Sequence, residues 1–166
     1  MGVNAKCDFK ELEELTETLE KLAKKDFNKF CEACAKELAA RLLRKVILRT
    51  QPGQYPPNSG KKGGTLRRGW TSKTHEEAVA GKGKGGNAAE YASKLPITKS
   101  GNMIQIEIIN PVNYASYVEF GHRTRNHKGW VQGKFMLTIS EQELESQAPK
   151  VLENKIKKFL ENCFDD

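Results

Sequence analysis

Apolar residues recur at helical spacing in three parts of the chain. In residues 8–22, Phe9 and the leucines after it lie three or four positions apart, and Asp8 with Glu11 forms a capping box in front of them. A second helical pattern covers residues 26–49 and would be about 36 Å long as one helix. A third occupies the C-terminal part. The pattern therefore predicts long N-terminal helices and a C-terminal helix.

The C-terminal helix has competing local signals. Ser140-Glu141-Gln142-Glu143 is a capping box by sequence, which would start the helix near Ser140. Pro149 interrupts the apolar pattern and predicts a new first turn. Beyond it, an apolar stripe continues through Val151, Leu152, Ile156, Phe159 and Leu160.

The middle of the chain carries shorter patterns. Alternating residues over 103–109 predict a strand, residues 112–120 are a second candidate strand, and residues 65–79 are interpreted as a helical turn followed by a strand. Proline and glycine predict mobile loops at about 50–64 and 80–90, and residues 121–134 are interpreted as a basic loop. The fold class is therefore α+β: long N-terminal helices, a small, mainly antiparallel sheet and a C-terminal helix, in a single domain over 1–166.

Composition narrows the function classes. Apolar residues make up 37% of the chain and charged residues 30%, which suggests a thin core or surfaces completed by neighbouring proteins. No run approaches the ~18 apolar residues of a membrane span, and no signal-peptide pattern is seen, so a cytosolic chain with reduced cysteines is expected. Cys31-x-x-Cys34 lacks further ligands at suitable spacing, so neither a metal nor a cofactor is expected.

The positive charge is unevenly distributed. The net charge of +7 divides into +2 over residues 1–50, +8 over 51–134 and −3 over 135–166. A basic middle segment favours a polyanion or an acidic protein surface. Such a field leaves open a stand-alone basic nucleic-acid-binding protein.

Two motifs suggest enzyme chemistry only weakly. Residues 81–86 match G-x-G-x-x-G but lack the strand before it and the helix after it. His122 and His127, with Arg123 and Arg125, could serve a small nuclease, yet no carboxylate with a clear role accompanies them. A solvated basic loop explains them more simply, so the chain is expected to have no small-molecule substrate and to be non-enzymatic.

Two dense stretches are more distinctive. Leu66-Arg67-Arg68-Gly69-Trp70 could pin a mobile loop to the sheet by cation–π contacts and salt bridges, or it could meet phosphates. In Tyr114–Gly121, a strand would bury Val118 and Phe120 and would place Tyr117 and Glu119 on the other face. That second pair would then be a buried polar pair or a subunit contact.

The order of these stretches resembles the neck and tail-completion proteins of long-tailed bacteriophages and of prophage-derived tail-like particles. Leu66–Trp70 follows a Pro/Gly loop, Tyr114–Gly121 ends the strand region, and Gly133-Lys134-Phe135-Met136 leads into the last helix. The resemblance covers roughly residues 9–160 and favours a last helix that begins near Phe135. The loop at 50–64 and the segment 80–100 depart from the family pattern.

The resemblance implies a structural virion protein that forms a ring between connector and tail. Its partners would be copies of itself, other neck and tail proteins and, through non-specific contact, packaged DNA; assembly would take place in the host cytoplasm, without a membrane. Expected interface or structural residues are Leu66, Arg67, Arg68, Trp70, Tyr114, Tyr117, Glu119, Phe120, Gly121 and Phe135; expected DNA-proximal residues are Lys61, Lys62, Lys82, Lys84, Arg123 and Arg125.

Overall fold

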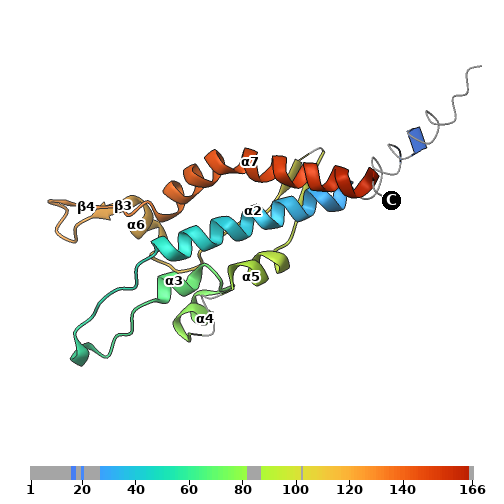
Figure 1. Ribbon diagram of the computed structural model, residues 1–166. Coiled ribbons are helices and arrows are strands. Elements are labelled where there is room, and N and C mark those ends of the chain that lie inside the picture. The colour runs from blue at the N-terminus through green and yellow to red at the C-terminus, as the bar shows by residue number, and fades with distance from the viewer. Residues whose placement is uncertain (1–15, 18–19, 21–26, 82–86, 102, 165–166) are drawn as a thin grey trace, which may run out of the picture.

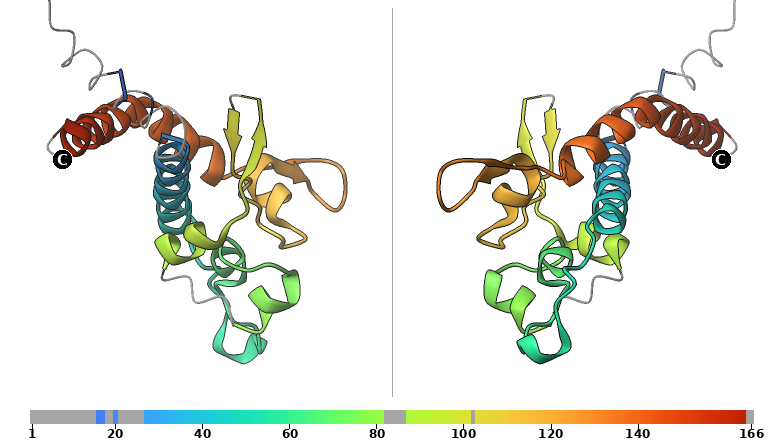
Figure 2. Two further views of the ribbon diagram at one scale, coloured as in Figure 1. Left: turned by 90° about the vertical axis from the view of Figure 1, so that its right-hand side faces the viewer. Right: turned by 90° about the vertical axis from the view of Figure 1, so that its left-hand side faces the viewer.

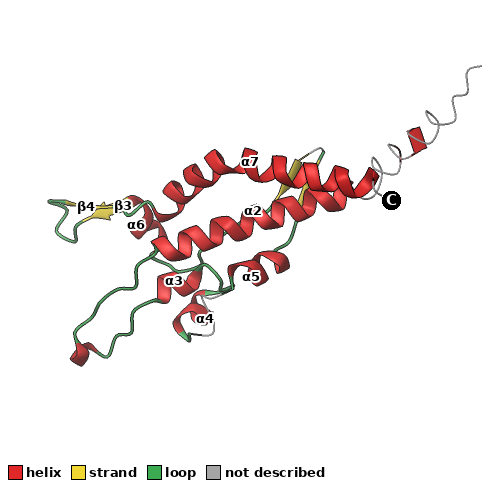
Figure 3. Ribbon diagram, in the orientation of Figure 1, coloured by secondary structure: helices red, strands yellow, loops and turns green. Residues whose placement is uncertain are grey.

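Two long helices organise the molecule. The computed structural model describes residues 16–17, 20, 27–81, 87–101 and 103–164. Helix α2 (Phe27–Arg49) and helix α7 (Met136–Phe164) lie side by side and run in opposite directions (Figures 1 and 2). The shorter elements between them in sequence pack around this pair, and the whole is an α+β fold as predicted (Figure 3).

Helix α2 confirms the predicted helix over 26–49. Its buried side chains recur at the spacing that keeps them on one face, and the face includes Ala39, Leu43, Val46 and Ile47. Leu43 and Val46 are fully buried. The helix predicted over 8–22 lies outside the described residues except for Thr16, Glu17 and Glu20, which are helical.

Helix α7 begins at Met136, which confirms the start near Phe135. The capping-box prediction at Ser140 is wrong, because Ser140 is fully buried inside the helix and its hydroxyl donates to Met136 O at 2.6 Å. The new first turn predicted at Pro149 is also wrong, since the proline lies within one continuous helix. Ion pairs to α2 lie on both sides of it, at Glu143 and at Lys155, and they hold the two halves of α7 against the same partner.

The segment predicted as a turn and a strand is helical in both parts. It forms α3 (Thr65–Gly69) and α4 (His75–Val79), and Thr74 caps α4 by accepting from Glu77 N at 3.2 Å. Helix α5 (Ala88–Lys94) follows, so the loop expected to extend to residue 90 ends at Asn87, whose side chain caps the helix. The loop predicted over about 50–64 is found over 51–64, mostly exposed and with one short 3-10 turn, η2 (Pro57–Ser59), whereas Thr50 is buried.

Both sheets of the described chain have two antiparallel strands. Strands β1 (Thr98–Ser100) and β2 (Met103–Gln105) pair with Lys99 opposite Ile104, so the strand predicted over 103–109 is shorter than expected. Strands β3 (Gly121–Arg123) and β4 (Trp130–Gln132) form a hairpin where a basic loop was predicted. The main-chain bonds of the hairpin therefore give that basic segment a fixed shape.

The second candidate strand, over 112–120, is wrong, because this segment forms helix α6 (Ala115–Phe120). Burial follows a helical period: Glu119 is buried and Ala115 and Val118 are half-buried, whereas Tyr117 and Phe120 are exposed. Phe120, expected in the core, is 60% exposed. In a strand, Glu119 and Tyr117 would lie on the same face. In the helix, the Glu119 carboxylate points inward to the start of α7, whereas Tyr117 points to solvent.

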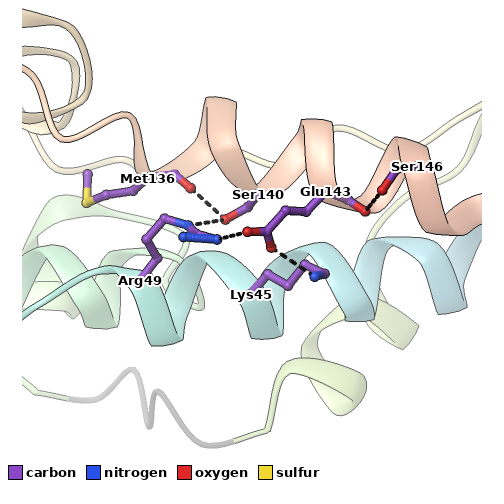
Figure 4. Close-up of polar contacts among 6 residues, drawn as sticks. All are labelled: Lys45, Arg49, Met136, Ser140, Glu143 and Ser146. Carbon is purple, nitrogen blue, oxygen red and sulfur yellow. Dashed lines mark hydrogen bonds and ion pairs between the residues drawn. The ribbon is translucent and has the colours of Figure 1, made fainter.

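A polar seam joins the C-terminal end of α2 to α7 (Figure 4). Glu143 accepts from Lys45 Nζ at 3.0 Å and from Arg49 Nη2 at 2.5 Å, and Arg49 Nε donates to Ser140 Oγ at 3.3 Å. The lysine hydrogen bond, with the charges of Lys45 and Arg49, holds the pKa of Glu143 below its ordinary value of 4.5. A lowered folded-state pKa means that the ionised carboxylate stabilises the fold above pH 4.5 and that this contribution is lost as the pH falls.

Replacing Glu143 with Gln is expected to lower the melting temperature at pH 7 by a few degrees, because one carboxylate serves two cations across the seam. The difference from the wild type should shrink as the pH falls from about 5 to about 3, where the wild-type carboxylate becomes protonated. Thermal melts followed by circular dichroism would measure both. Glu153→Gln is the matched control, since Glu153 pairs with Lys157 within α7 and both side chains are exposed. An equal loss in the control, or a difference that persists at the lowest pH, would contradict the role of the seam.

Candidate assembly surface

Arg68 fastens the long loop to the core. Its guanidinium donates from Nε to Ala78 O at 2.9 Å, from Nη1 to Gly63 O at 3.3 Å and from Nη2 to Thr65 Oγ1 at 3.3 Å. The arginine thus pins the loop, as one of the two interpretations of this motif expected, but through carbonyl and hydroxyl acceptors rather than through cation–π contacts or salt bridges to a sheet. Arg67 is half-buried, on the same short helix.

Leu66 and Trp70 belong to the core. Trp70 is 4% exposed, and its indole N–H donates to Thr50 Oγ1 at 2.8 Å. Leu66 is buried too, and its carbonyl accepts from Asn110 Nδ2 at 2.9 Å. Leu66 and Trp70 therefore stabilise the core, and they are too buried to contact another protein. Tyr114 lies partly exposed beside this region, and burial is the main cause that raises its pKa.

Glu119 is the anchor between α6 and α7. Its carboxylate is buried and accepts three hydrogen bonds: from Leu137 N at 3.0 Å, from Thr138 N at 2.9 Å and from Thr138 Oγ1 at 2.9 Å. The first backbone N–H groups of a helix have no partner within the helix, and a negative charge there is favoured by the helix dipole. Glu119 thus caps α7 from a distant part of the sequence.

The chain between α6 and α7 is closely packed. Lys134 N donates to Val118 O at 2.8 Å, and Phe135 N donates to Glu119 O at 3.0 Å. Phe135 has a φ of 48°, a left-handed conformation that is rare for a large side chain. A Cβ on Gly121, where φ is 86°, would lie 2.4 Å from Val131 O, so only glycine fits there. The hairpin is therefore fixed tightly to the start of α7.

Large apolar side chains are exposed on α6 and on β4, at this end of the molecule. Tyr117 is 58% exposed, Phe120 60%, Trp130 59% and Val131 44%; we call these four residues together the aromatic surface, although Trp130 and Val131, as neighbours in a strand, point to opposite faces of the hairpin. The Tyr117 ring meets the His122 ring edge-on at 5.7 Å between centroids. Exposed aromatic residues on a rigid support are typical of protein interfaces.

The turn of the hairpin is basic and internally ordered. Thr124 N donates to Gly129 O at 3.0 Å, Gly129 N donates to Thr124 Oγ1 at 3.0 Å, and Thr124 Oγ1 donates to Asn126 Oδ1 at 2.6 Å. Arg123, Arg125 and Lys128 are exposed around this turn, and none of them forms an ion pair within the described ranges. These three side chains can therefore meet an anionic partner.

The other expected basic residues lie elsewhere. Lys61 and Lys62 are exposed on the long loop, where Lys61 Nζ sits 5.9 Å from the centre of the Tyr55 ring. Lys82, Lys84 and most of the G-x-G-x-x-G match fall outside the described residues. The hairpin and the long loop leave the helical body as separate projections (Figure 1).

The candidate nuclease residues remain an open prediction. His122 and His127 lie on the hairpin, and His122 Nδ1 is 2.9 Å from Arg123 O. In the part of the chain that the structure describes, no three His, Cys, Asp or Glu side chains are grouped so that they could hold a metal ion.

No described helix is long and apolar enough to cross a membrane. Cys31 and Cys34 are free thiols.

Exposed aromatic and basic side chains on an ordered support are typical of proteins that bind other proteins. Comparison with protein families agrees with this class: residues 13–121 match the HK97-gp10-like family, described as "Bacteriophage HK97-gp10, putative tail-component". The match covers more than half of the chain, so the protein belongs to this family of phage tail-related structural proteins. Neither the curated proteins nor the solved structures contain a match.

The sequence signal for α6 was present, but the strand interpretation used the wrong period. Tyr114, Tyr117 and Phe120 are spaced by three, as are Ala115 and Val118, which is the spacing of helix faces. The role of Glu119 as a cap for α7 had no local signal, since the N–H groups that its carboxylate accepts from lie 18 and 19 residues further along the chain.

Glu119→Gln is expected to lower the free energy of unfolding by about 1–3 kcal/mol, because the amide has one acceptor oxygen for three donors and no charge for the helix end. Urea denaturation at pH 7 would measure the loss. Glu141→Gln, an exposed change in the same helix, is the control and should stay within about 0.5 kcal/mol of the wild type. Equal effects of the two substitutions would show that the cap does not hold α6 and α7 together.

Proposed function

We propose that this protein is a subunit of the head–tail junction, a neck or tail-completion protein that forms a ring between connector and tail in the virion. Family membership supports a phage tail-related structural role, and the aromatic surface is the observation that carries the proposal further. A closed ring needs a surface that meets a different surface of the next copy. The aromatic surface, at one end of the molecule, suits such a contact.

Rigidity supports an interface role for this surface. A surface that is already ordered loses less conformational entropy when it binds than a flexible one does. Glu119, Gly121 and the left-handed Phe135 fix the hairpin to α7, so Tyr117, Phe120 and Trp130 are held in place before any partner arrives. Leu66, Arg68 and Trp70 contribute by holding the underlying core and loop.

The basic residues support a second contact, with DNA that crosses the junction. Arg123, Arg125 and Lys128 surround an ordered turn, and Lys61 and Lys62 lie on an exposed loop. Sequence-independent binding of DNA depends on such cations at phosphates. Lys82 and Lys84 belong to the same proposal on their sequence alone. A stand-alone nucleic-acid-binding protein would use the same residues but would bind DNA tightly without assembling.

Phe120→Ser combined with Trp130→Ser is expected to abolish complete particles in the phage or prophage that encodes this chain, because both side chains are exposed and neither supports the core. Electron microscopy should show separate heads and tails, and circular dichroism should show that the purified variant remains folded. Met103→Ser with Ile109→Ser, which removes exposed apolar groups from another face, is the control. Normal particles from the aromatic variant would overturn the proposed interface.

Arg123→Gln with Arg125→Gln is expected to weaken DNA binding and leave assembly unchanged. Each phosphate contact that the substitutions remove should make the plot of log affinity against log salt less steep by about 0.9, so the slope should fall in magnitude by about one to two. Fluorescence anisotropy with a random-sequence duplex at several salt concentrations would measure it. The same applies to changing Lys61, Lys62, Lys82 and Lys84 to Gln. Loss of assembly in either variant would rule out a DNA-facing role for those residues.

A further inference from the structure

The start of α2 and the end of α7 lie at the opposite end of the helix pair from the hairpin (Figure 1), and they carry a second group of exposed apolar side chains. Phe27 is 49% exposed, Ile156 44% and Leu160 40%, and the half-buried Phe159 lies between them; we call these four residues the terminal patch. Phe159 stacks on Phe30 at 4.5 Å between ring centroids, and Phe27 approaches Phe159 at 6.5 Å. The patch is therefore a continuous apolar area built from α2 and α7.

Lysines flank the patch on α7. Residues 150–164 hold four lysines and two glutamates, Glu153 and Glu161, a net charge of +2. Lys155 is paired with Glu37 and Lys157 with Glu153, whereas Lys150 and Lys158 are exposed and have no ion pair in the part of the chain described. A partner for this area should present apolar side chains flanked by carboxylates.

One segment of the chain itself has that chemistry. Residues 8–22 carry six acidic and two basic side chains, a net charge of −4, and their apolar stripe consists of Phe9, Leu12, Leu15, Leu19 and Leu22. As a helix the segment would be about 22 Å long, enough to lie along the last three turns of α7. Thr16, Glu17 and Glu20, which the structure describes, are helical and exposed.

The position of the described piece favours another molecule as the acceptor. Thr16–Glu17 lie beyond the C-terminal end of α7 rather than against its side (Figure 1). We propose that the acidic segment 8–22 of one copy binds the terminal patch of a second copy, as an amphipathic helix laid across α2 and α7. The proposal rests on the proposed function only in requiring that copies assemble, and it leaves the aromatic surface free for a different contact.

Exchange of this kind links copies by a segment that is short and separate from the core. Burying four leucines and a phenylalanine against the patch supplies apolar area, and the opposite charges fix the direction and register of the helix. Because the charges are exposed at the rim, the association should weaken as salt is raised. A helix bound to its own chain would show none of the concentration dependence expected here.

A complementation experiment with two full-length variants tests the exchange. The segment variant carries Leu12→Ser, Leu15→Ser and Leu19→Ser and keeps the patch. The patch variant carries Ile156→Ser and Leu160→Ser, both exposed positions, and keeps the segment. Light scattering after size exclusion should show that the wild type associates and that each variant alone associates at least tenfold more weakly.

Mixing the two variants should restore association, because the intact segment of one fits the intact patch of the other. Native mass spectrometry with one variant isotope-labelled should find pairs that contain one chain of each kind. Leu48→Ser with Val79→Ser, two exposed apolar positions elsewhere, is the control and should associate like the wild type. Lys157→Glu with Lys158→Glu is a second patch variant that changes charge alone and should also associate more weakly.

Three outcomes would overturn the proposal: a monomeric wild type up to about 100 µM, variants that associate as well as the wild type, or a mixture that forms no mixed pairs. The first would indicate a segment bound to its own chain, and the last a partner of another kind. Each is distinguishable from failure of the proposed function. If mixed pairs form but the protein is absent from purified particles, the head–tail role fails and the exchange stands. If the Phe120 and Trp130 variant loses particles as expected but the segment and patch variants form no mixed pairs, the exchange fails and the head–tail role stands.

Discussion

The last turn of α2 holds the contacts on which the rest of the structure depends. Arg49 crosses to Glu143 and Ser140 on α7, and the next residue, Thr50, donates to Val46 O and accepts the indole N–H of Trp70. Two neighbouring residues thus join the long helix pair to the short helix α3. Since Trp70 and Thr50 are almost fully buried, their hydrogen bond satisfies polar atoms that would otherwise be costly to remove from water.

This arrangement compensates for a small core. The described core has ten buried residues. Four come from α2, and other segments add Leu66, Trp70, Ala78, Ala92, Val112 and Met136. Small side chains such as Ala78 and Ala92 let α4 and α5 pack closely against the rest of the core, but each contributes little buried apolar area. Polar links such as Arg68 to Ala78 O and Glu119 to α7 therefore have a larger share in fixing the shape than they would in a protein with a larger core.

The sequence predicted the elements whose stability is local. The apolar period predicted α2 almost to the residue. Proline and glycine predicted a loop over about 50–64, and the structure has it over 51–64, because Thr50 is buried. Prediction failed where contacts between residues far apart in the sequence determine where an element begins or which face is buried. Ser140-Glu141-Gln142-Glu143 looks like a helix start, but the true cap is Glu119, which frees Ser140 and Glu143 to face α2. The segment around Tyr117 is short enough to fit either period, and its main-chain hydrogen bond from Val118 N to Tyr114 O, with the inward Glu119 carboxylate, identifies it as a helix.

The charge pattern along the chain becomes meaningful once the ends of the helix pair are compared. The hairpin end combines the aromatic surface with Arg123, Arg125 and Lys128, and the other end combines the terminal patch with lysines of α7. Both ends are apolar, and the described end of α7 (residues 150–164, four lysines and two glutamates) has a small positive charge like the hairpin, so neither end attracts the other by charge. The acidic, leucine-rich residues 8–22 have the opposite character to both, and the lysine-flanked patch offers them a site at the end of α7 nearest to where the described Thr16–Glu17 lie. The exchange proposed for residues 8–22 would avoid the free-energy cost of bringing like charges together, which a direct end-to-end contact would incur.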